Sequence, residues 1–327
     1  MRAAQPLARA VGVTRAFYRR GRFLGRSVPV MALRGVDVEV QRAETVGVVG
    51  ESGCGKSTLG RVMLGLLAPT EGQVLFDGED LAQQTQAHLR TLRRRMQMVF
   101  QDPYGSLDPR RTVGAQIGDG IVIHRLAAGV EVAERVALLL RQVGLNPADA
   151  GRLPHEFSGG QRQRIAVARA LATAPEFIVA DEPVSALDVS IQAQVVNLLA
   201  DLRADLGLAL LFISHDLHVV RHLCDRLVVM YLGRVMEEGP ASEIFAAPVH
   251  PYTRALLAAT PSLRHRAAPV PLMGEVPSIA SPPTGCVFRT RCPMAQPDCA
   301  ETVPTLQTLK GTGDRRIACL RAEEIAT

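Results

Sequence analysis

Short apolar runs alternate with longer amphipathic patterns along this chain up to roughly residue 240. The short runs are strand-sized and bounded by polar or turn residues, which predicts buried β-strands, and the longer segments have the apolar spacing of helices. We expect strands at residues 46–49, 97–100, 177–180, 209–213 and 227–230, and helices at 59–67, 130–143, 158–172 and 189–206. This alternation predicts an α/β fold with a mostly parallel sheet and helices on both faces, which binds ligands at the carboxyl ends of its strands.

The pattern changes after about Phe245. Prolines become frequent between Pro248 and Pro304, the alternation of strands and helices fades, and four cysteines lie in this tail. Turn signals such as Pro282-Pro283 predict little regular structure there. We therefore expect two domains, residues 1–245 and a small irregular domain over residues 246–327, and we find no internal repeat.

Composition and charge limit the class of protein further. Of the 327 residues, 47% are hydrophobic and 21% are charged, so the chain can bury an ordinary core. The net charge of +5 is spread out except at residues 93–95, three arginines that predict a solvated helix face or a partner contact, and we expect no nucleic acid partner. No stretch approaches the roughly 18 apolar residues of a membrane span, and we see no signal peptide. We expect a cytosolic protein whose cysteines are free or metal-bound rather than paired.

Residues 50–58 read GESGCGKST and lie between a predicted strand and a predicted helix, the setting in which the pattern G-x-x-x-x-G-K-[ST] binds phosphate. Its glycines let backbone N–H groups point inward, and the following helix adds the positive end of its dipole. The predicted nucleotide contacts are Gly50, Ser52, Gly53, Cys54, Gly55, Lys56, Ser57 and Thr58. We expect Lys56 to reach the β- and γ-phosphates and the Ser57 hydroxyl to ligate Mg²⁺. The alternative is a glycine-rich turn, against which the Lys-Ser-Thr sequence argues.

A second candidate motif follows the predicted strand at residues 177–180, where the chain continues with Asp181 and Glu182. An aspartate at a strand end beside a phosphate loop can hold magnesium, and the next acid can polarise an attacking water. We therefore expect Asp181 to bind the metal and Glu182 to act as the general base. Alone, such a pair is usually a helix cap or a loop acid, and the phosphate loop favours the catalytic interpretation.

A third motif, Ser158-Gly159-Gly160-Gln161, opens a predicted helix. Ser158 is a good helix cap, and the two glycines expose backbone N–H groups, so this turn is a second candidate anion site. One chain with two phosphate sites suggests that two chains complete each other's nucleotide sites. A Ser-Gly-Gly turn at a helix start is common, so the residues alone leave this open.

In order and spacing, these motifs resemble those of ATP-binding cassette (ABC) ATPases over about residues 10–240. The resemblance adds Gln101 as the Q-loop glutamine, residues 185–188 as the D-loop with Asp188, and His215 as the switch histidine. The family's signature motif usually begins with leucine, where this chain has Phe157. That departure leaves Ser158 and its glycines untouched.

The resemblance implies a P-loop NTPase fold and a head-to-tail dimer that sandwiches two ATP molecules. Ser158, Gly159 and Gly160 would then contact the γ-phosphate bound by the partner chain, and Gln161 and Asp188 would also be nucleotide-binding residues. His215 would hold the γ-phosphate or the attacking water, and Gln101 would sense Mg²⁺ and signal to a membrane partner. Phe17 would stack on adenine, with Tyr18 as the second choice. Taken singly, each of these residues also has an ordinary structural interpretation.

The Q-loop at residues 99–109, the segment 181–192 and the tail segment 250–256 resemble the ATPase subunits of bacterial oligopeptide/dipeptide importers. The run Gln161-Arg162-Gln163-Arg164 looks most like the F-type subunit. This implies an energy-coupling ATPase at the cytoplasmic face of the cell membrane. Its partners would be a D-type ATPase subunit, two membrane permeases and an extracytoplasmic peptide-binding protein. A nickel-importer subunit, a soluble cassette ATPase acting on DNA or ribosomes, and a P-loop kinase are the alternatives.

The tail cysteines Cys286, Cys292, Cys299 and Cys319 form a C-x5-C-x6-C-x19-C array. Four thiolates in a small proline-rich segment could bind zinc or an iron–sulfur cluster, and free cysteines are the third interpretation. The array lacks the tight C-x2-C spacing of zinc ribbons, and the resemblance to these importers implies a [4Fe–4S] cluster. Cys54 and Cys224 stand apart and are expected only to pack.

Overall fold

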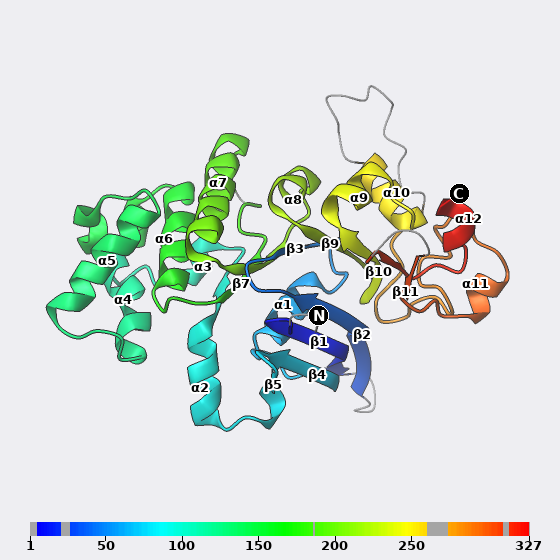
Figure 1. Ribbon diagram of the computed structural model, residues 1–327, viewed down its shortest axis with the longest axis horizontal. Coiled ribbons are helices and arrows are strands. Elements are labelled where there is room, and N and C mark those ends of the chain that lie inside the picture. The colour runs from blue at the N-terminus through cyan, green and yellow to red at the C-terminus, as the bar shows by residue number, and fades with distance from the viewer. Residues whose placement is uncertain (1–4, 21–26, 186, 260–273, 310–313, 327) are drawn as a thin grey trace. The chain divides into compact units, whose positions relative to one another are not determined.

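The computed structural model describes residues 5–20, 27–185, 187–259, 274–309 and 314–326 (Figure 1). The chain folds into two compact units, each assembled from separate segments. The first unit comprises Met1–Ala8, Val40–Thr45 and Phe76–Ser214, and the second comprises Arg9–Glu39, Val46–Leu75 and His215–Thr327. Among the described helices, none combines the length and the apolar composition of a membrane span.

The first unit contains a parallel set of strands, β6 (Met96–Val99), β7 (Phe177–Asp181) and β8 (Ala209–Ile213), with β7 between the other two. Every residue of β7 and β8 is buried, which explains why both read as continuous apolar runs. The predictions for these strands are confirmed, with β6 beginning and ending one residue earlier than expected. The parallel pairing places Asp181 opposite Ile213 at the carboxyl end of this set.

The helices of the first unit are α2 (Gln86–Arg95), α3 (Pro103–Ser106), α4 (Val113–Ile123), α5 (Val130–Gln142), α6 (Gly159–Leu171) and α7 (Val189–Leu206). The short strand β5 (Glu79–Asp80) and three 3₁₀ turns, Leu81–Gln83, Pro147–Gly151 and Pro154–Glu156, complete it. Figure 1 shows α4, α5 and α6 packed together. Helix α4 was not predicted from the sequence, because its glycines lower helix propensity. It nevertheless buries an apolar face that includes Ile117 and Ile121.

The arginine run at residues 93–95 forms the last turn of α2. Arg95 forms ion pairs with Asp77 and Glu176, and Arg42 pairs with the same two acids. The prediction of a solvated run is therefore wrong for Arg95, whose side chain is only 27% exposed. The network ties the end of α2 to Glu176, the residue that precedes β7.

The second unit holds two groups of strands. The first group runs in the order β2 (Ser27–Val40), β1 (Ala8–Arg20), β4 (Glu71–Phe76), which lie side by side in Figure 1. In the second group, β3 (Thr45–Val49) pairs parallel with β9 (Arg226–Tyr231), and antiparallel pairing continues through β10 (Arg234–Pro240), β12 (Arg316–Ile317) and β11 (Gln307–Thr308). The helices are α1 (Lys56–Met63), α8 (Leu217–Leu223), α9 (Ala241–Ala246), α10 (Pro251–Ala258), α11 (Asp298–Glu301) and α12 (Ala322–Ala326).

Within this second unit, the tail is held to strand β10 by backbone pairing and by buried charge. β12 pairs with β10, with Ile317 opposite Glu237 and Arg316 opposite Glu238. Glu237 is fully buried and accepts hydrogen bonds from the Arg315 side chain and from the backbone N–H groups of residues 249 and 250. A carboxylate that is buried this deeply requires such partners.

We expect His250 to make the stability of this unit depend on pH. Burial lowers the pKa of its imidazole to about 4, and its Nδ1 accepts the Tyr252 backbone N–H at 3.0 Å. The unfolded chain binds the proton below about pH 6.5 and the folded chain only below about pH 4, so stability falls as pH drops through that window. We expect a loss of up to about 3 kcal/mol, measured by urea unfolding at several pH values. His250→Asn, which keeps an acceptor but cannot titrate, should flatten the profile, and an unchanged slope would contradict the assignment.

Candidate functional site

The predicted phosphate loop connects β3 to α1, as expected from the sequence. Three of its glycines have left-handed or other positive φ values: Gly50 at 149°, Gly53 at 78° and Gly55 at 107°. A Cβ atom on Gly50 would lie 2.1 Å from the Met230 carbonyl oxygen, and one on Gly55 would lie 2.5 Å from the Ala32 carbonyl oxygen. These two positions therefore require glycine for space as well as for backbone conformation.

Lys56 is the first residue of α1 and is only 5% exposed. Its ammonium group curls back over the loop and donates to the carbonyl oxygens of Gly50 at 2.8 Å and Glu51 at 3.1 Å. The Cys54 sulfur lies 3.9 Å from the same ammonium, and burial raises the pKa of this thiol. The loop thus surrounds one cation, as expected for a site that receives phosphate.

In the first unit, Asp181 ends β7 and is 3% exposed, and Glu182 follows with a left-handed φ of 46°. The Glu182 backbone N–H donates to the Ile213 carbonyl oxygen at 2.9 Å, which holds this sharp exit from the strand. The Gln101 amide donates to the Glu182 carboxylate at 2.9 Å. The structure thus joins two predicted catalytic residues that lie 81 positions apart in sequence.

The motif at residues 158–161 forms the start of α6 through a reciprocal capping box. The Ser158 hydroxyl accepts the Gln161 backbone N–H at 3.3 Å, and the Gln161 side chain accepts the Ser158 backbone N–H at 2.9 Å. The prediction that Ser158 caps this helix is confirmed. Ser158 and Gln161 are exposed, so the helix start is open to a ligand.

The two glycines of this motif differ in their surroundings, which gives a testable contrast. A Cβ atom on Gly160 would lie 2.3 Å from Ile191 Cγ2 on α7, whereas one on Gly159 would meet only Leu187 Cδ2 at 3.5 Å. We expect Gly160→Ala to lower the free energy of unfolding by about 1–3 kcal/mol through overpacking, and Gly159→Ala to be nearly neutral. Urea unfolding of both variants checks this. Equal stability of the two would contradict the prediction and show that α7 can shift to make room for the added methyl group.

Four residues named by the sequence predictions lie on exposed surface. Phe17, on β1, is 41% exposed and has the Arg15 guanidinium 5.0 Å from its ring centroid, while Tyr18 is 67% exposed. His215 is exposed between β8 and α8, and Asp188 is exposed before α7, which its side chain does not cap. Ala186 of the D-loop lies outside the described residues. An aromatic ring on an open strand is available for stacking, which remains a prediction for Phe17.

The predicted residues divide between the two units. The first unit carries Gln101, Ser158, Gly159, Gly160, Gln161, Asp181, Glu182 and Asp188, and the second carries Phe17, the phosphate loop and His215. The sequence predictions missed two side chains that contact the loop, Tyr252 and Arg291, both of which bind Glu51. They lie 201 and 240 positions from Glu51, and no local pattern signals a contact over that distance.

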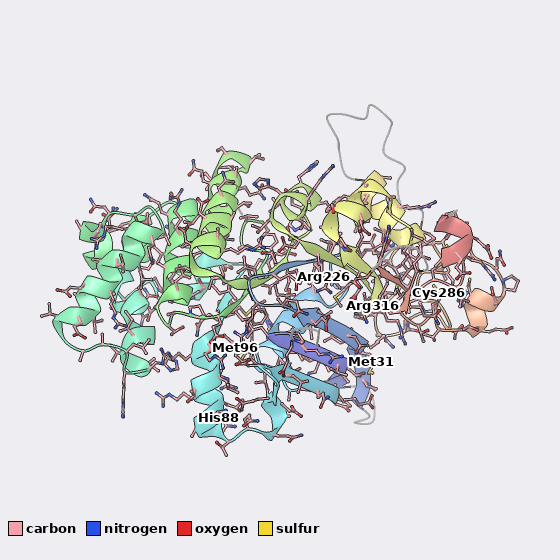
Figure 2. All side chains as sticks on the ribbon, viewed as in Figure 1. Met31, His88, Met96, Arg226, Cys286 and Arg316 are labelled. Atoms are coloured by element: carbon pink, nitrogen blue, oxygen red, sulfur yellow. The ribbon has the colours of Figure 1, made fainter. Side chains whose placement is uncertain are left out.

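None of the six cysteines forms a disulfide. Cys286, Cys292, Cys299 and Cys319 line one pocket with His250 and Phe288, and Figure 2 labels Cys286 in this segment. Burial raises the pKa of the Cys319 thiol to about 11 and also raises those of Cys286 and Cys292. Within the described ranges, no group of three or more His, Cys, Asp or Glu side chains is arranged to hold a metal ion.

The comparison with known proteins decides the family. The ABC transporter family model matches residues 33–185, and the model for the oligopeptide/dipeptide transporter C-terminal region matches residues 236–299. A putative peptide import ATP-binding protein of Brucella ovis is 55% identical over 287 residues, covering 87% of this chain and 90% of the relative. The chain belongs to the ABC transporter ATPase family.

Other relatives agree with this cassette assignment. The oligopeptide transport ATP-binding protein AppF of Bacillus subtilis is 53% identical over 291 residues, covering 88% of each chain. The structure of the ATP-binding cassette MJ0796, a dimer in a post-hydrolysis state bound to ADP and Pi, superposes with a TM-score of 0.64 at 30% identity, covering 72% of this chain and 98% of that one. The resemblance to importer ATPases of the oligopeptide/dipeptide group and the P-loop NTPase fold class are confirmed.

Proposed function

We propose that this ABC ATPase is the energy-coupling subunit of an importer for di- or oligopeptides. The observation that carries the proposal is the combination, in one chain, of a cassette and an oligopeptide/dipeptide transporter C-terminal region. Relatives that align over 87–88% of this chain are named peptide import or oligopeptide transport ATP-binding proteins. The nickel-importer, DNA- or ribosome-acting and kinase alternatives have no comparable support.

We assign the steps of ATP hydrolysis to the residues that the family motifs name. Lys56 would bind the β- and γ-phosphates, and Glu182, positioned by Gln101, would take a proton from the attacking water. His215 would orient that water or the γ-phosphate. Ser57, Gln101 and Asp181 would hold Mg²⁺, which when bound neutralises the charge that develops on the phosphates. Phe17 would stack on the adenine.

We propose that a second ATPase subunit of D type completes each nucleotide site. The open capping box of α6 supports this, since an exposed helix N-terminus is a ready anion site. Ser158, Gly159, Gly160, Gln161 and Asp188 would contact the nucleotide of that partner. ATP would then close the dimer, because it bridges two chains, and hydrolysis would open it. Two permeases would anchor the pair to the cytoplasmic face of the membrane, and an extracytoplasmic protein would deliver peptide.

Reconstitution tests this assignment. The complex should be isolated from membranes through a tag on this chain, its subunits identified, and its ATPase activity measured in proteoliposomes. Stimulation by a peptide-loaded binding protein, and not by Ni²⁺ with a nickel-binding protein, is the expected result. Isolation without any permease, or transfer of phosphate to a small molecule instead of water, would overturn the proposal.

For the tail, we propose that Cys286, Cys292, Cys299 and Cys319 hold a [4Fe–4S] cluster. The support is that all four thiols line one pocket, since such a cluster takes one thiolate on each of its irons. The residues would have to lose their protons on binding, because the metal ligand is the thiolate. Iron and sulfide analysis of anaerobically purified protein is the test. Stoichiometric zinc without iron would support the zinc alternative. If the protein contains neither zinc nor iron, the four cysteines are free.

A further inference from the structure

Glu51, the second residue of the phosphate loop, is held by the tail of the chain. Its backbone N–H donates to the Tyr252 hydroxyl at 2.9 Å. Its carboxylate accepts two hydrogen bonds from Arg291, one from Nη1 at 2.7 Å and one from Nη2 at 3.0 Å. Its carbonyl oxygen accepts from the Lys56 ammonium at 3.1 Å. All the polar groups of Glu51 therefore have partners, and the tail supplies most of them.

Arg291 is itself fixed in place. Its side chain is only 4% exposed, and Nη1 also lies 3.3 Å from the Tyr231 hydroxyl. Phe288 packs against the rings of Tyr231 and Tyr252, with centroids 5.4 Å and 5.3 Å away. A two-pronged guanidinium–carboxylate contact in such a packed setting has one geometry, unlike a surface ion pair between mobile side chains.

The charge of Glu51 is the reason that this contact bears on nucleotide binding. A carboxylate within a loop that receives a triphosphate would repel the ligand, and it would compete for the nearby Lys56 ammonium. Arg291 neutralises that carboxylate from the side of the tail. The contact with Glu51 also raises the pKa of Arg291, so the guanidinium stays charged.

We propose that Arg291 is a positioning residue for ATP: it neutralises Glu51 and fixes the first turn of the phosphate loop in the form that accepts the triphosphate. This inference rests on the proposed ATPase function. Because Arg291 directly precedes Cys292, it also joins the cysteine-bearing segment to the phosphate loop. The tail then contributes to nucleotide binding, because one of its residues sets the charge and the conformation of the phosphate loop.

Binding measurements on the full-length chain test the proposal. The dissociation constant of a fluorescent ATP analogue with Mg²⁺ should rise by about tenfold in Arg291→Gln and less in Arg291→Lys. Glu51→Gln placed in the Arg291→Gln background should recover most of the loss, because the unpaired carboxylate is then gone. The defect of Arg291→Gln should also shrink at high ionic strength, since it is electrostatic. A role in packing alone predicts neither the recovery nor the salt dependence.

Arg289→Gln is the matched control. Arg289 lies two residues away in the same segment, but its side chain donates to the carbonyl oxygen and the hydroxyl of Thr284, and no hydrogen bond or ion pair to Glu51 is seen among the described residues. This variant should bind the analogue as the unsubstituted chain does. Equal affinities of Arg291→Gln and Arg289→Gln, or a double variant as weak as Arg291→Gln, would overturn the proposal. If Arg291→Gln does not fold, Arg291→Met with and without Glu51→Gln gives the same comparison, because Met also removes the positive charge. Failure of the unsubstituted chain to bind would instead overturn the proposed function.

Discussion

Glu182→Gln is expected to lower the rate of ATP hydrolysis by about 10²–10⁴-fold while ATP binding stays within about twofold. The substitution removes the proton acceptor but keeps the size of the side chain. The amide oxygen that replaces the carboxylate can still accept the hydrogen bond that Gln101 donates at 2.9 Å. The backbone contact to Ile213, which sets the left-handed turn after β7, is also retained. Phosphate release and binding of a fluorescent ATP analogue measure the two effects separately.

The same variant tests the shared site. Because hydrolysis is what opens the proposed dimer, Glu182→Gln should stay associated with its ATPase partner in the presence of MgATP, as read by size-exclusion chromatography. Gln101→Ala is the control: it removes the contact but leaves the carboxylate, so its hydrolysis rate should fall by a smaller factor. Turnover of Glu182→Gln close to that of the unsubstituted chain would remove Glu182 from the role of base.

The elements predicted best from sequence are those marked by a continuous apolar run or by a clear end signal. β8 and α7 have the predicted bounds, because β8 is buried at every position and α7 is closed by Gly207 in the left-handed conformation. The long strands β1 and β2 were not predicted. Along β2 the buried Val36, Val38 and Val40 alternate with more exposed residues, so no continuous apolar run marks the strand.

The features of the candidate site also differ in how far the sequence predicts them. The phosphate loop and the capping box at Ser158 are local structures, set by residue types within a few positions of each other, and the sequence predicts both. The Gln101 contact to Glu182 could be expected only through the family resemblance. The contacts of Tyr252 and Arg291 with Glu51 join residues that are 201 and 240 positions apart in sequence. They form only through tertiary packing, for which a single sequence carries no signal.

Arg315→Ala is expected to lower the free energy of unfolding by about 3–5 kcal/mol, because it leaves the fully buried carboxylate of Glu237 without its cation. The neighbouring pair, Glu238 and Arg316, is the matched control. The side chain of Arg316 (labelled in Figure 2) is 34% exposed, so its truncation removes less buried side-chain surface than truncation of Arg315.

Glu238 also has two features that should reduce the cost of losing Arg316. Burial already raises the pKa of Glu238, so the carboxyl group can take up a proton, and Arg226 remains 3.9 Å away. Arg316→Ala should therefore cost clearly less than Arg315→Ala, about 1 kcal/mol, in urea unfolding at neutral pH. Equal costs would mean that β10–β12 backbone pairing, and not the buried charge of Glu237, holds the tail to the cassette. The predicted difference would instead make Glu237–Arg315 the principal electrostatic anchor of the segment that carries Arg291.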